Sequence, residues 1–298
     1  MQARSLVMDA QGRRLYMQAV QNAILTQFLT GGDFLKGGAA LQLSYPLRET
    51  RASQDVDAVF ADSARDFERR MTEALTCGWQ GFTGTVKPLP HREHTLMPKN
   101  ASMSRYRISL LYLGKPFSSF YMEAVPDING AAGRHVRRMD GQTRGMLAEL
   151  GFDVSDAPVM DPLTQLAEKL HAVSRPGKTR GRDLADIALM VRSEDIDMDS
   201  LRSVVDDVVA RQGQHAVHAL DDADKNSFIA SFSETGSPIP FEDAWNLTQR
   251  LLTSVEHDVK GGQRDRASAA AAGGDVWVGP HIRDGRPVSG YWRRRPSL

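Results

Sequence analysis

The 298-residue sequence is poor in cysteine, in aromatic residues and in net charge. Its one cysteine, Cys77, excludes a disulfide framework and a cysteine-rich zinc site, and it fits a reducing compartment. Aromatic residues make up 7% of the chain, and Lys plus Arg balance Asp plus Glu at 37 each. No overall charge therefore draws the protein toward nucleic acid or a membrane, and any such contact must come from a local patch.

Long apolar runs are also missing. No segment approaches the roughly 20 apolar residues of a membrane span. The first thirty residues interrupt their apolar positions with Asp9, Arg13 and Arg14, so they contain no signal-peptide core. We therefore expect a cytoplasmic protein without a membrane segment.

The composition is that of an ordinary globular protein, with 41% hydrophobic and 25% charged residues. Because single cores stop growing at about 250 to 300 residues, we expect two domains. The spacing of apolar residues changes along the chain and indicates the domain boundaries. We predict a first domain over residues 1–130, a helical domain over 131–258, a flexible linker rich in Gly and Ala over 259–275, and a basic aromatic tail over 276–298.

Helical and alternating patterns are mixed in the first domain. They predict helices over 12–29 and 63–75, a glycine turn and short helix over 37–45, and strands over 55–60, 82–86, 106–113 and 117–125. This order is typical of an α+β fold in which helices cover a sheet from one side. From Asp161 onward the period is helical, and it predicts helices over 163–173, 184–191, 198–212, 222–233 and 240–257.

The chemistry is concentrated around a glycine pair and an acidic pair. Gly37-Gly38 forms a turn before a helix, and Asp55 and Asp57 follow at positions i and i+2 of a predicted strand. Alternate strand residues project from one face, so the two carboxylates suit the binding of one or two Mg²⁺ (or Mn²⁺) ions against a triphosphate. The helix start supplies backbone N–H groups for phosphates.

Each half of this pattern also has an ordinary structural explanation. A lone Asp-x-Asp is usually a solvated strand face, and a lone Gly-Gly is usually only a turn. A third carboxylate, Glu123, lies within the apolar strand 117–125 and is either a further metal ligand or an exposed or ion-paired residue. The order and spacing of the two motifs favour the functional interpretation.

These motifs carry a resemblance. The segment from Phe34 to Leu41, followed by Arg51-x-Ser53-x-Asp55-x-Asp57, resembles the nucleotidyltransferase signature of the AbiEii family of toxins, which includes the MenT toxins. Residues Glu168 to Ala172, followed by Gly181-Arg182-Asp183-Leu184-x-Asp186-Ile187, resemble that family's helical-domain motif. The similarity extends over roughly residues 20–192, and two ordered motifs are more specific than one.

The resemblance implies a polymerase-β-like mixed sheet flanked by helices, with a helical domain completing the active-site cleft. It also implies NTP and Mg²⁺ dependence, a separate antitoxin partner, and, as in some members, transfer of a nucleotide to the 3′ end of tRNA. By the same resemblance, Asp55 and Asp57 are metal ligands, Gly37, Gly38 and Ser53 lie beside the phosphates, Lys169 and Arg182 bind the nucleotide, and Asp183 is a further acid or base.

The chain departs from the family pattern at the turn. Ala39 follows Gly37-Gly38 where the family often has Thr, and the superfamily often has Ser directly after the first glycine. The phosphate contacts must therefore come from the main chain or from Ser53. We assign no function to Asp186, which borders the apolar stripe of its helix, and we expect His171 to be a partly buried helix histidine.

Other polar clusters have weaker interpretations. His91 and His94 flank Glu93, but no third ligand has the spacing of a zinc site. Arg134, Arg137 and Arg138, with His135, are by default a solvated face, although such a cluster also suits an RNA backbone.

Several functions remain open at this point. The leading hypothesis is a toxin nucleotidyltransferase acting on tRNA. The alternatives are nucleotide transfer to a protein or to a small molecule such as an antibiotic, phosphate rather than nucleotide transfer, and a binding or regulatory module without turnover. The oligomeric state stays undetermined.

Overall fold

The computed structural model describes residues 10–53, 55–90, 103–127, 135–212, 215–256, 275–278, 281–283, 286–288 and 291–294. The chain divides into two compact units, Met1–Asp161 and Pro162–Leu298. Within the described ranges, no helix has both the length and the apolar character needed to span a bilayer.

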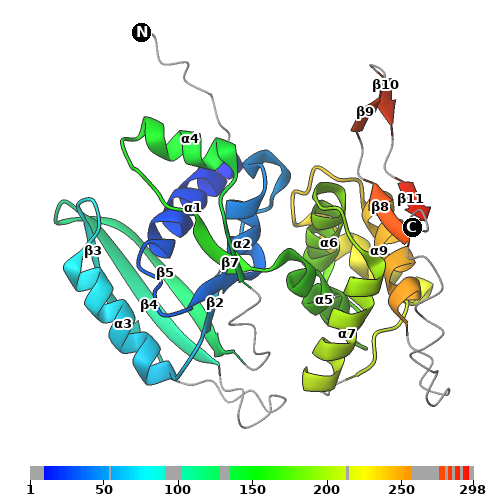
Figure 1. Ribbon diagram of the computed structural model, residues 1–298, viewed down its shortest axis with the longest axis horizontal. Coiled ribbons are helices and arrows are strands. Elements are labelled where there is room, and N and C mark those ends of the chain that lie inside the picture. Colours follow the sequence, from blue (N-terminus) through cyan, green and yellow to red (C-terminus); the bar gives the residue numbers. More distant parts are fainter. Residues whose placement is uncertain are drawn as a thin grey trace. The chain divides into compact units, whose positions relative to one another are not determined.

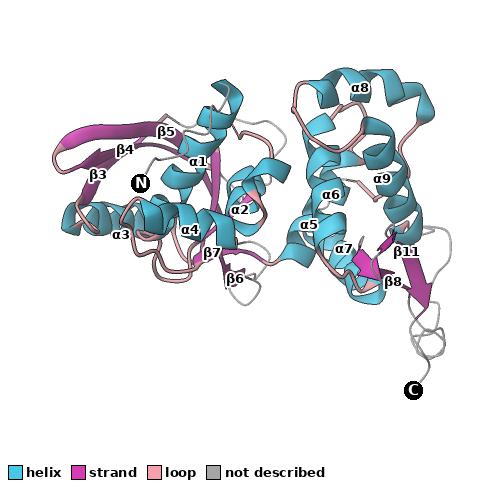
Figure 2. Ribbon diagram, turned by 90° about the horizontal axis from the view of Figure 1, so that it is seen from above, coloured by secondary structure: helices cyan, strands magenta, loops and turns pink. Residues whose placement is uncertain are grey.

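The described residues of the first unit form a seven-stranded mixed sheet flanked by helices (Figures 1 and 2). The helices are α1 (Ala10–Thr26), α2 (Gly37–Ser44), α3 (Ala64–Cys77) and α4 (Gly141–Glu149). The strands are β1 (Phe34–Lys36), β2 (Val56–Phe60), β3 (Phe82–Pro88), β4 (Ser104–Tyr112), β5 (Lys115–Pro126), β6 (His135–Arg138) and β7 (Ala157–Met160). They are ordered β3-β4-β5-β2-β1-β7-β6; β2–β5 and β1–β7 are parallel and the other pairs are antiparallel. The α+β class expected from the sequence is confirmed.

The two faces of β2 have different roles. Val56, Ala58 and Phe60 belong to the large core in which residues of α1, α2, α3 and α4 pack on the sheet. Val59 belongs instead to a small separate cluster with Phe34 and Met160. Because side chains alternate across a strand, Asp57 shares the face of Val59 and points away from the main core.

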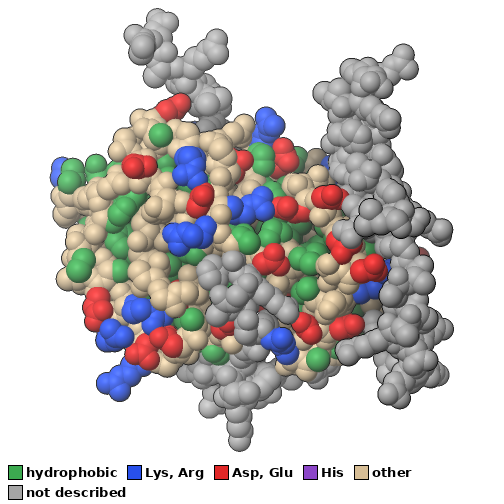
Figure 3. All heavy atoms as spheres, in the orientation of Figure 1, with side chains coloured by type: hydrophobic (Ala, Val, Ile, Leu, Met, Phe, Trp, Pro, Cys, Tyr) green, Lys and Arg blue, Asp and Glu red, His purple; other side chains and the backbone are tan. Residues whose placement is uncertain are grey.

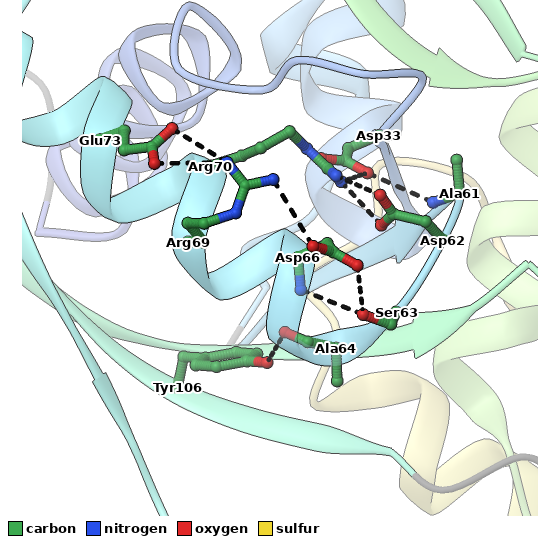
Figure 4. Close-up of polar contacts among 10 residues, drawn as sticks. All are labelled: Asp33, Ala61, Asp62, Ser63, Ala64, Asp66, Arg69, Arg70, Glu73 and Tyr106. Atoms are coloured by element: carbon green, nitrogen blue, oxygen red, sulfur yellow. Dashed lines mark hydrogen bonds and ion pairs between the residues drawn. The ribbon is translucent and has the colours of Figure 1, made fainter.

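An ion-pair cluster connects the loop before β1 to the loop after β2 (Figure 4). Arg70 of α3 donates to the fully buried Asp33 at 2.8 Å and also pairs with Asp62. Asp33 accepts the backbone N–H of Ala61 at 3.2 Å. Burial raises the pKa of Asp33, and the hydrogen bonds from Arg70 only partly oppose this. The cluster ties the residue before β1 to the residues after β2, which fixes how these two strands pair.

The second unit is helical. Its described helices are α5 (Pro162–Val173), α6 (Gly181–Ser193), α7 (Met198–Gln212), α8 (Lys225–Ser233) and α9 (Phe241–Val255), with a 3₁₀ turn, η3, at Asp222–Asp224. α6 is the central element, because it packs against α5, α8 and α9 and is buried from Leu184 to Val191. The helical period from residue 161 onward therefore marks real helices, with bounds that differ by a few residues from those predicted.

The boundary between the units differs from the one predicted. We expected it after residue 130, but the first compact unit extends to Asp161. The reason is that β6 and β7 belong to the sheet: β7 pairs with β1 through Leu35 and Val159, and β6 pairs with β7. Four-residue strands of this kind have too short a pattern to be recognised from periodicity.

The C-terminal residues contain two short antiparallel pairs. β8 (Asp275–Val278) pairs with β11 (Tyr291–Arg294), and β9 (His281–Arg283) pairs with β10 (Arg286–Val288). Arg283 lies opposite Arg286. Residues 284 and 285 lie outside the described residues, as does the predicted linker apart from Asp275.

Candidate active site

The glycine turn and the acidic strand meet in the first unit. Gly37 is the first residue of α2 and has a φ of +63°, which favours glycine. Lys36, just before it, is the strand partner of Asp57. A Cβ added at Gly37 would lie 3.2 Å from Cγ of Asp57 and nearer still to its Oδ2. The carboxylate of Asp57 therefore faces the start of α2, and only a residue without a side chain leaves room for it.

Gly38 makes a second close approach. A Cβ added there would lie 3.0 Å from Oγ of Ser53 and 3.7 Å from Nη1 of Arg51. No hydroxyl side chain is present in the first three residues of α2, Gly-Gly-Ala, so the Ser53 hydroxyl is the one brought to this turn by tertiary structure. Ser53 and Asp57 thus reach the glycine turn from the same segment of chain.

Amide side chains hold the segment that carries Ser53. Gln18 of α1 accepts the backbone N–H of Ser53 at 3.2 Å and donates to its carbonyl oxygen at 2.5 Å. Gln42 of α2 donates to the carbonyl oxygen of Arg51 at 2.9 Å, and Asn22 donates to Gln42 at 2.8 Å. The Ser53 hydroxyl donates to the carbonyl oxygen of Asp55 at 2.8 Å.

The sequence interpretation missed Gln18, Asn22 and Gln42. Gln42 did carry a usable signal, because it is a polar residue inside an otherwise apolar short helix and is fully buried. Buried amides normally mark a hydrogen-bond network, so such a residue indicates a fixed neighbouring segment. Gln18 and Asn22 had no comparable signal within the polar positions of α1.

The three predicted metal ligands are not equally placed. Glu123 lies opposite Asp57 in the parallel β2–β5 register, so the two carboxylates are neighbours on adjacent strands. Glu123 also accepts a hydrogen bond from Arg105 at 3.2 Å. Asp55 precedes β2 in a bend, so strand alternation does not fix its direction. In the part of the chain that the structure describes, no three or more His, Cys, Asp or Glu side chains form a group that could hold a metal ion.

Asp57, with Glu123 beside it, nevertheless has the chemistry of a hard-cation site. Carboxylate oxygens are the ligands that Mg²⁺ and Mn²⁺ accept most readily. The space left by Gly37 keeps the Asp57 carboxylate close to the helix start, where the backbone dipole favours an anion such as phosphate. The residues present therefore fit an ion that bridges a carboxylate and a phosphate.

A second polar cluster lies within the helical unit. Lys169 of α5 is 7% exposed, and its Nζ donates to Asp183 at 3.0 Å and to Asp186 at 2.6 Å, both on α6. Arg180 donates to Asp183 at 3.2 Å. Burial alone would raise the pKa of Asp183, but the charges of Lys169 and Arg180 outweigh it and lower the pKa, so this carboxylate is ionised near neutral pH.

Asp186 has a larger role in this cluster than its sequence position suggested. It is 2% exposed and makes the shorter of the two contacts with Lys169. Arg182, between the paired residues, is exposed. Gly181 is required by packing, since a Cβ added there would lie 2.8 Å from Cα of Phe232 on α8 and closer still to its backbone nitrogen.

His171 is buried, as its helix position predicted, and it has a partner. Its ring stacks on that of His215 with the ring centroids 4.1 Å apart. Each ring nitrogen Nε2 contacts the other residue's carbonyl oxygen, at 3.2 and 2.7 Å. Burial is the main cause that lowers the pKa of both histidines.

The basic cluster is only partly described. Arg137 is exposed on β6, whereas Arg138 donates to the carbonyl oxygen of Ser44 at 3.2 Å and lies over the ring of Tyr45 at 5.1 Å. Arg134 and the segment with His91, Glu93 and His94 lie outside the described residues. Acidic and basic side chains are interspersed on the face shown in Figure 3, as expected for zero net charge.

The described site therefore consists of a glycine-lined helix start that faces a strand carboxylate on a mixed sheet, and a helical unit follows in the chain. The chain belongs to the family described as nucleotidyl transferase AbiEii toxin, Type IV TA system, which it matches over residues 22–258. It is therefore a nucleotidyltransferase of the toxin–antitoxin class, and this class implies an NTP substrate and an antitoxin partner.

Two solved structures show some similarity to the chain. MenT4, a nucleotidyltransferase toxin from Mycobacterium tuberculosis H37Rv, is 18% identical with a TM-score of 0.49, over 84% of this chain and 96% of that one. JHP933 from Helicobacter pylori is 13% identical with a TM-score of 0.46, over 80% of this chain and 91% of that one. No protein with a curated description matches the chain.

Proposed function

We propose that this toxin transfers a nucleoside monophosphate from an NTP to the 3′ end of tRNA, with Mg²⁺ or Mn²⁺ as the cofactor. The observation that carries the proposal is the approach of the Asp57 carboxylate to Gly37 at the start of α2. A carboxylate at this point would help to bind a divalent cation next to a phosphate.

In the proposed reaction, the terminal ribose hydroxyl of the acceptor attacks the α-phosphorus of the NTP. A new phosphorus–oxygen bond forms, the hydroxyl proton passes to solvent, the bond to the β-phosphate oxygen breaks, and pyrophosphate leaves. A bound divalent cation supplies charge neutralisation for the attacking and leaving oxygens. Asp55 and Asp57, with Glu123, are the proposed ligands of that cation.

The remaining proposed roles belong to binding groups. Gly37, Gly38 and Ser53 offer main-chain N–H groups and one hydroxyl to the phosphates. Lys169 and Arg182 are the proposed nucleotide-binding cations of the helical unit. Asp183 is the proposed further acid or base, and because its pKa is lowered it is ionised at neutral pH, where it can accept but not donate a proton.

A labelling experiment tests this proposal. The protein is incubated with each α-labelled NTP, Mg²⁺ and total RNA, and the label is followed into RNA, protein and small-molecule fractions. We expect label in tRNA, and none when the terminal ribose has first been oxidised with periodate. Label confined to protein or small molecules would exclude the tRNA assignment, and transfer of γ-label alone would indicate a kinase.

Variants test the residues. Asp55→Ala and Asp57→Asn should each lower transfer at least about 100-fold and relieve growth inhibition, since each removes a proposed ligand of the divalent cation. Asp153→Asn, at an exposed carboxylate of the same unit, is the matched control and should behave as the parent. If the Asp57→Asn variant remained fully toxic, Asp57 would have no role as a metal ligand. If the parent bound NTP but transferred no nucleotide, a binding module would be favoured.

A further inference from the structure

A cavity of about 280 Å³ opens beside the candidate active site, within the first unit. It lies where β2 begins and β5 continues past it, since Val56, the first residue of β2, pairs with Met122, well inside β5. Ser53, Asp55 and Val56 form one side of the cavity, α1 contributes two glutamines and an asparagine, and β4 and β5 contribute the rest. The cavity therefore shares two residues with the candidate site.

The wall of the cavity has the chemistry that recognises a nucleoside. Tyr121 of β5 is 47% exposed, although large apolar rings are usually covered. Arg107 of β4 is its cross-strand neighbour, is exposed, and donates from Nε to Ser119 at 3.1 Å, which orients the guanidinium along the wall. An aromatic ring beside an arginine suits base stacking and phosphate binding, and the Gln21 amide on α1 suits the polar edge of a base.

The position of the cavity beside Asp55 indicates which substrate group it would hold. The Asp57 carboxylate faces Gly37 and the helix start, where phosphates of a donor would bind, whereas Asp55 faces the cavity. In an in-line displacement the attacking and leaving oxygens lie on opposite sides of the phosphorus. If the leaving pyrophosphate is held at the glycine turn, the attacking hydroxyl comes from the side of Asp55.

We propose that this cavity binds the 3′-terminal nucleoside of a single-stranded RNA acceptor, with its base stacked on Tyr121 and its phosphate near Arg107. This inference rests on the proposed function and specifies the acceptor subsite. The cavity volume lies just below the roughly 300 to 1,000 Å³ of pockets for drug-sized ligands, which favours a single nucleoside over a dinucleotide.

The first experiment separates acceptor binding from donor binding. Steady-state transfer to total tRNA is measured for the parent, Tyr121→Ala and Tyr121→Phe while RNA and NTP are varied independently. Base stacking on an aromatic ring contributes enough to predict a rise of about 5- to 100-fold in KM for RNA with Tyr121→Ala. KM for NTP should be unchanged, and Tyr121→Phe should stay within about twofold of the parent.

Arg107→Gln should also raise KM for RNA and should reduce its dependence on salt, because one phosphate contact is lost. Arg65→Gln, at an exposed arginine of α3, and Leu113→Ala, at a residue 71% exposed, are the matched controls and should leave both KM values unchanged.

The second experiment is independent of turnover. Short single-stranded RNA carries 2-aminopurine either at its 3′ end or internally, and its fluorescence is titrated with the protein in the absence of NTP. Stacking should quench the terminal probe more than the internal one, and Tyr121→Ala should remove this difference.

The outcomes distinguish the inference from the proposed function. If the parent labels RNA but Tyr121→Ala leaves KM for RNA and the terminal quenching unchanged, the cavity is not the acceptor subsite. A rise in KM for NTP instead would assign the cavity to the donor base and overturn the inference. If the parent labels only protein or a small molecule, both the proposed function and the inference are wrong.

Discussion

Gly37→Ala offers the sharpest test of the candidate site, because the backbone conformation and the packing against Asp57 each favour glycine and can be tested separately. Its φ of +63° costs any other residue about 1 to 2 kcal/mol. Its missing side chain also makes room for Asp57, whose Cγ would lie 3.2 Å from an added Cβ and whose Oδ2 would lie closer. The methyl group must therefore displace the carboxylate.

The expected result is a loss of activity much larger than the loss of stability. A displacement of about 1 Å at a reacting centre can lower turnover about 100-fold, so we expect at least that decrease for Gly37→Ala. The backbone strain should lower the melting temperature by only about 2 to 4 °C for each kcal/mol. Nucleotide transfer and thermal unfolding are measured on the same preparations.

Gly114→Ala is the matched control. Gly114 has a φ of +76° in the turn between β4 and β5 of the same unit, and nothing lies within 4 Å of an added Cβ. This variant should lose similar stability and keep parental turnover. If both variants lose activity equally, or if Gly37→Ala remains fully active, then the fit between Gly37 and Asp57 does not control the reaction.

Three further predictions concern the helical unit and one helix of the first unit. Lys169→Met should lower the free energy of unfolding measured in urea by about 3 to 5 kcal/mol, because it leaves buried carboxylates without their cation; a change below about 1 kcal/mol would contradict this. Gly181→Ala should cost about 1 to 3 kcal/mol by forcing α6 from the α8 backbone, whereas Gly145→Ala, in open space on α4, should be neutral or stabilising by up to about 1 kcal/mol. The pKa values of His171 and His215 are lowered in the folded protein, so as pH falls the unfolded chain binds protons at a higher pH than the folded protein does. The free energy of unfolding should therefore decrease as pH drops below about 6.5. His215→Asn should flatten that decrease in a series of unfolding curves at different pH, and an unchanged pH dependence would exclude the histidine pair as its source.

Much of this protein follows from local patterns in its sequence. The alternation around Asp57 and the glycine pair at 37–38 predict a strand and a turn because each depends on a few consecutive residues. Helical periodicity similarly predicts α5 to α9, whose apolar stripes are long enough to be recognised. The family signature is visible for the same reason, since its two motifs are short and ordered.

Tertiary structure decided which of these residues meet. Three contacts join residues separated by 17 to 66 positions in the chain: the approach of Asp57 to Gly37, the pairing of Glu123 with Asp57, and the burial of Asp186 against Lys169. Periodicity contains no information about such distances, because it reports only which face of an element is buried.

The same limit explains the boundary and the cavity. Two short strands after residue 130 join the sheet because β7 pairs with β1 and β6 pairs with β7, which no local pattern specifies. The cavity exists because β5 continues beyond the start of β2, and strand register is set by the whole sheet. The sequence by itself therefore determined the elements and the chemical groups, and the packing of distant segments determined which groups share a site.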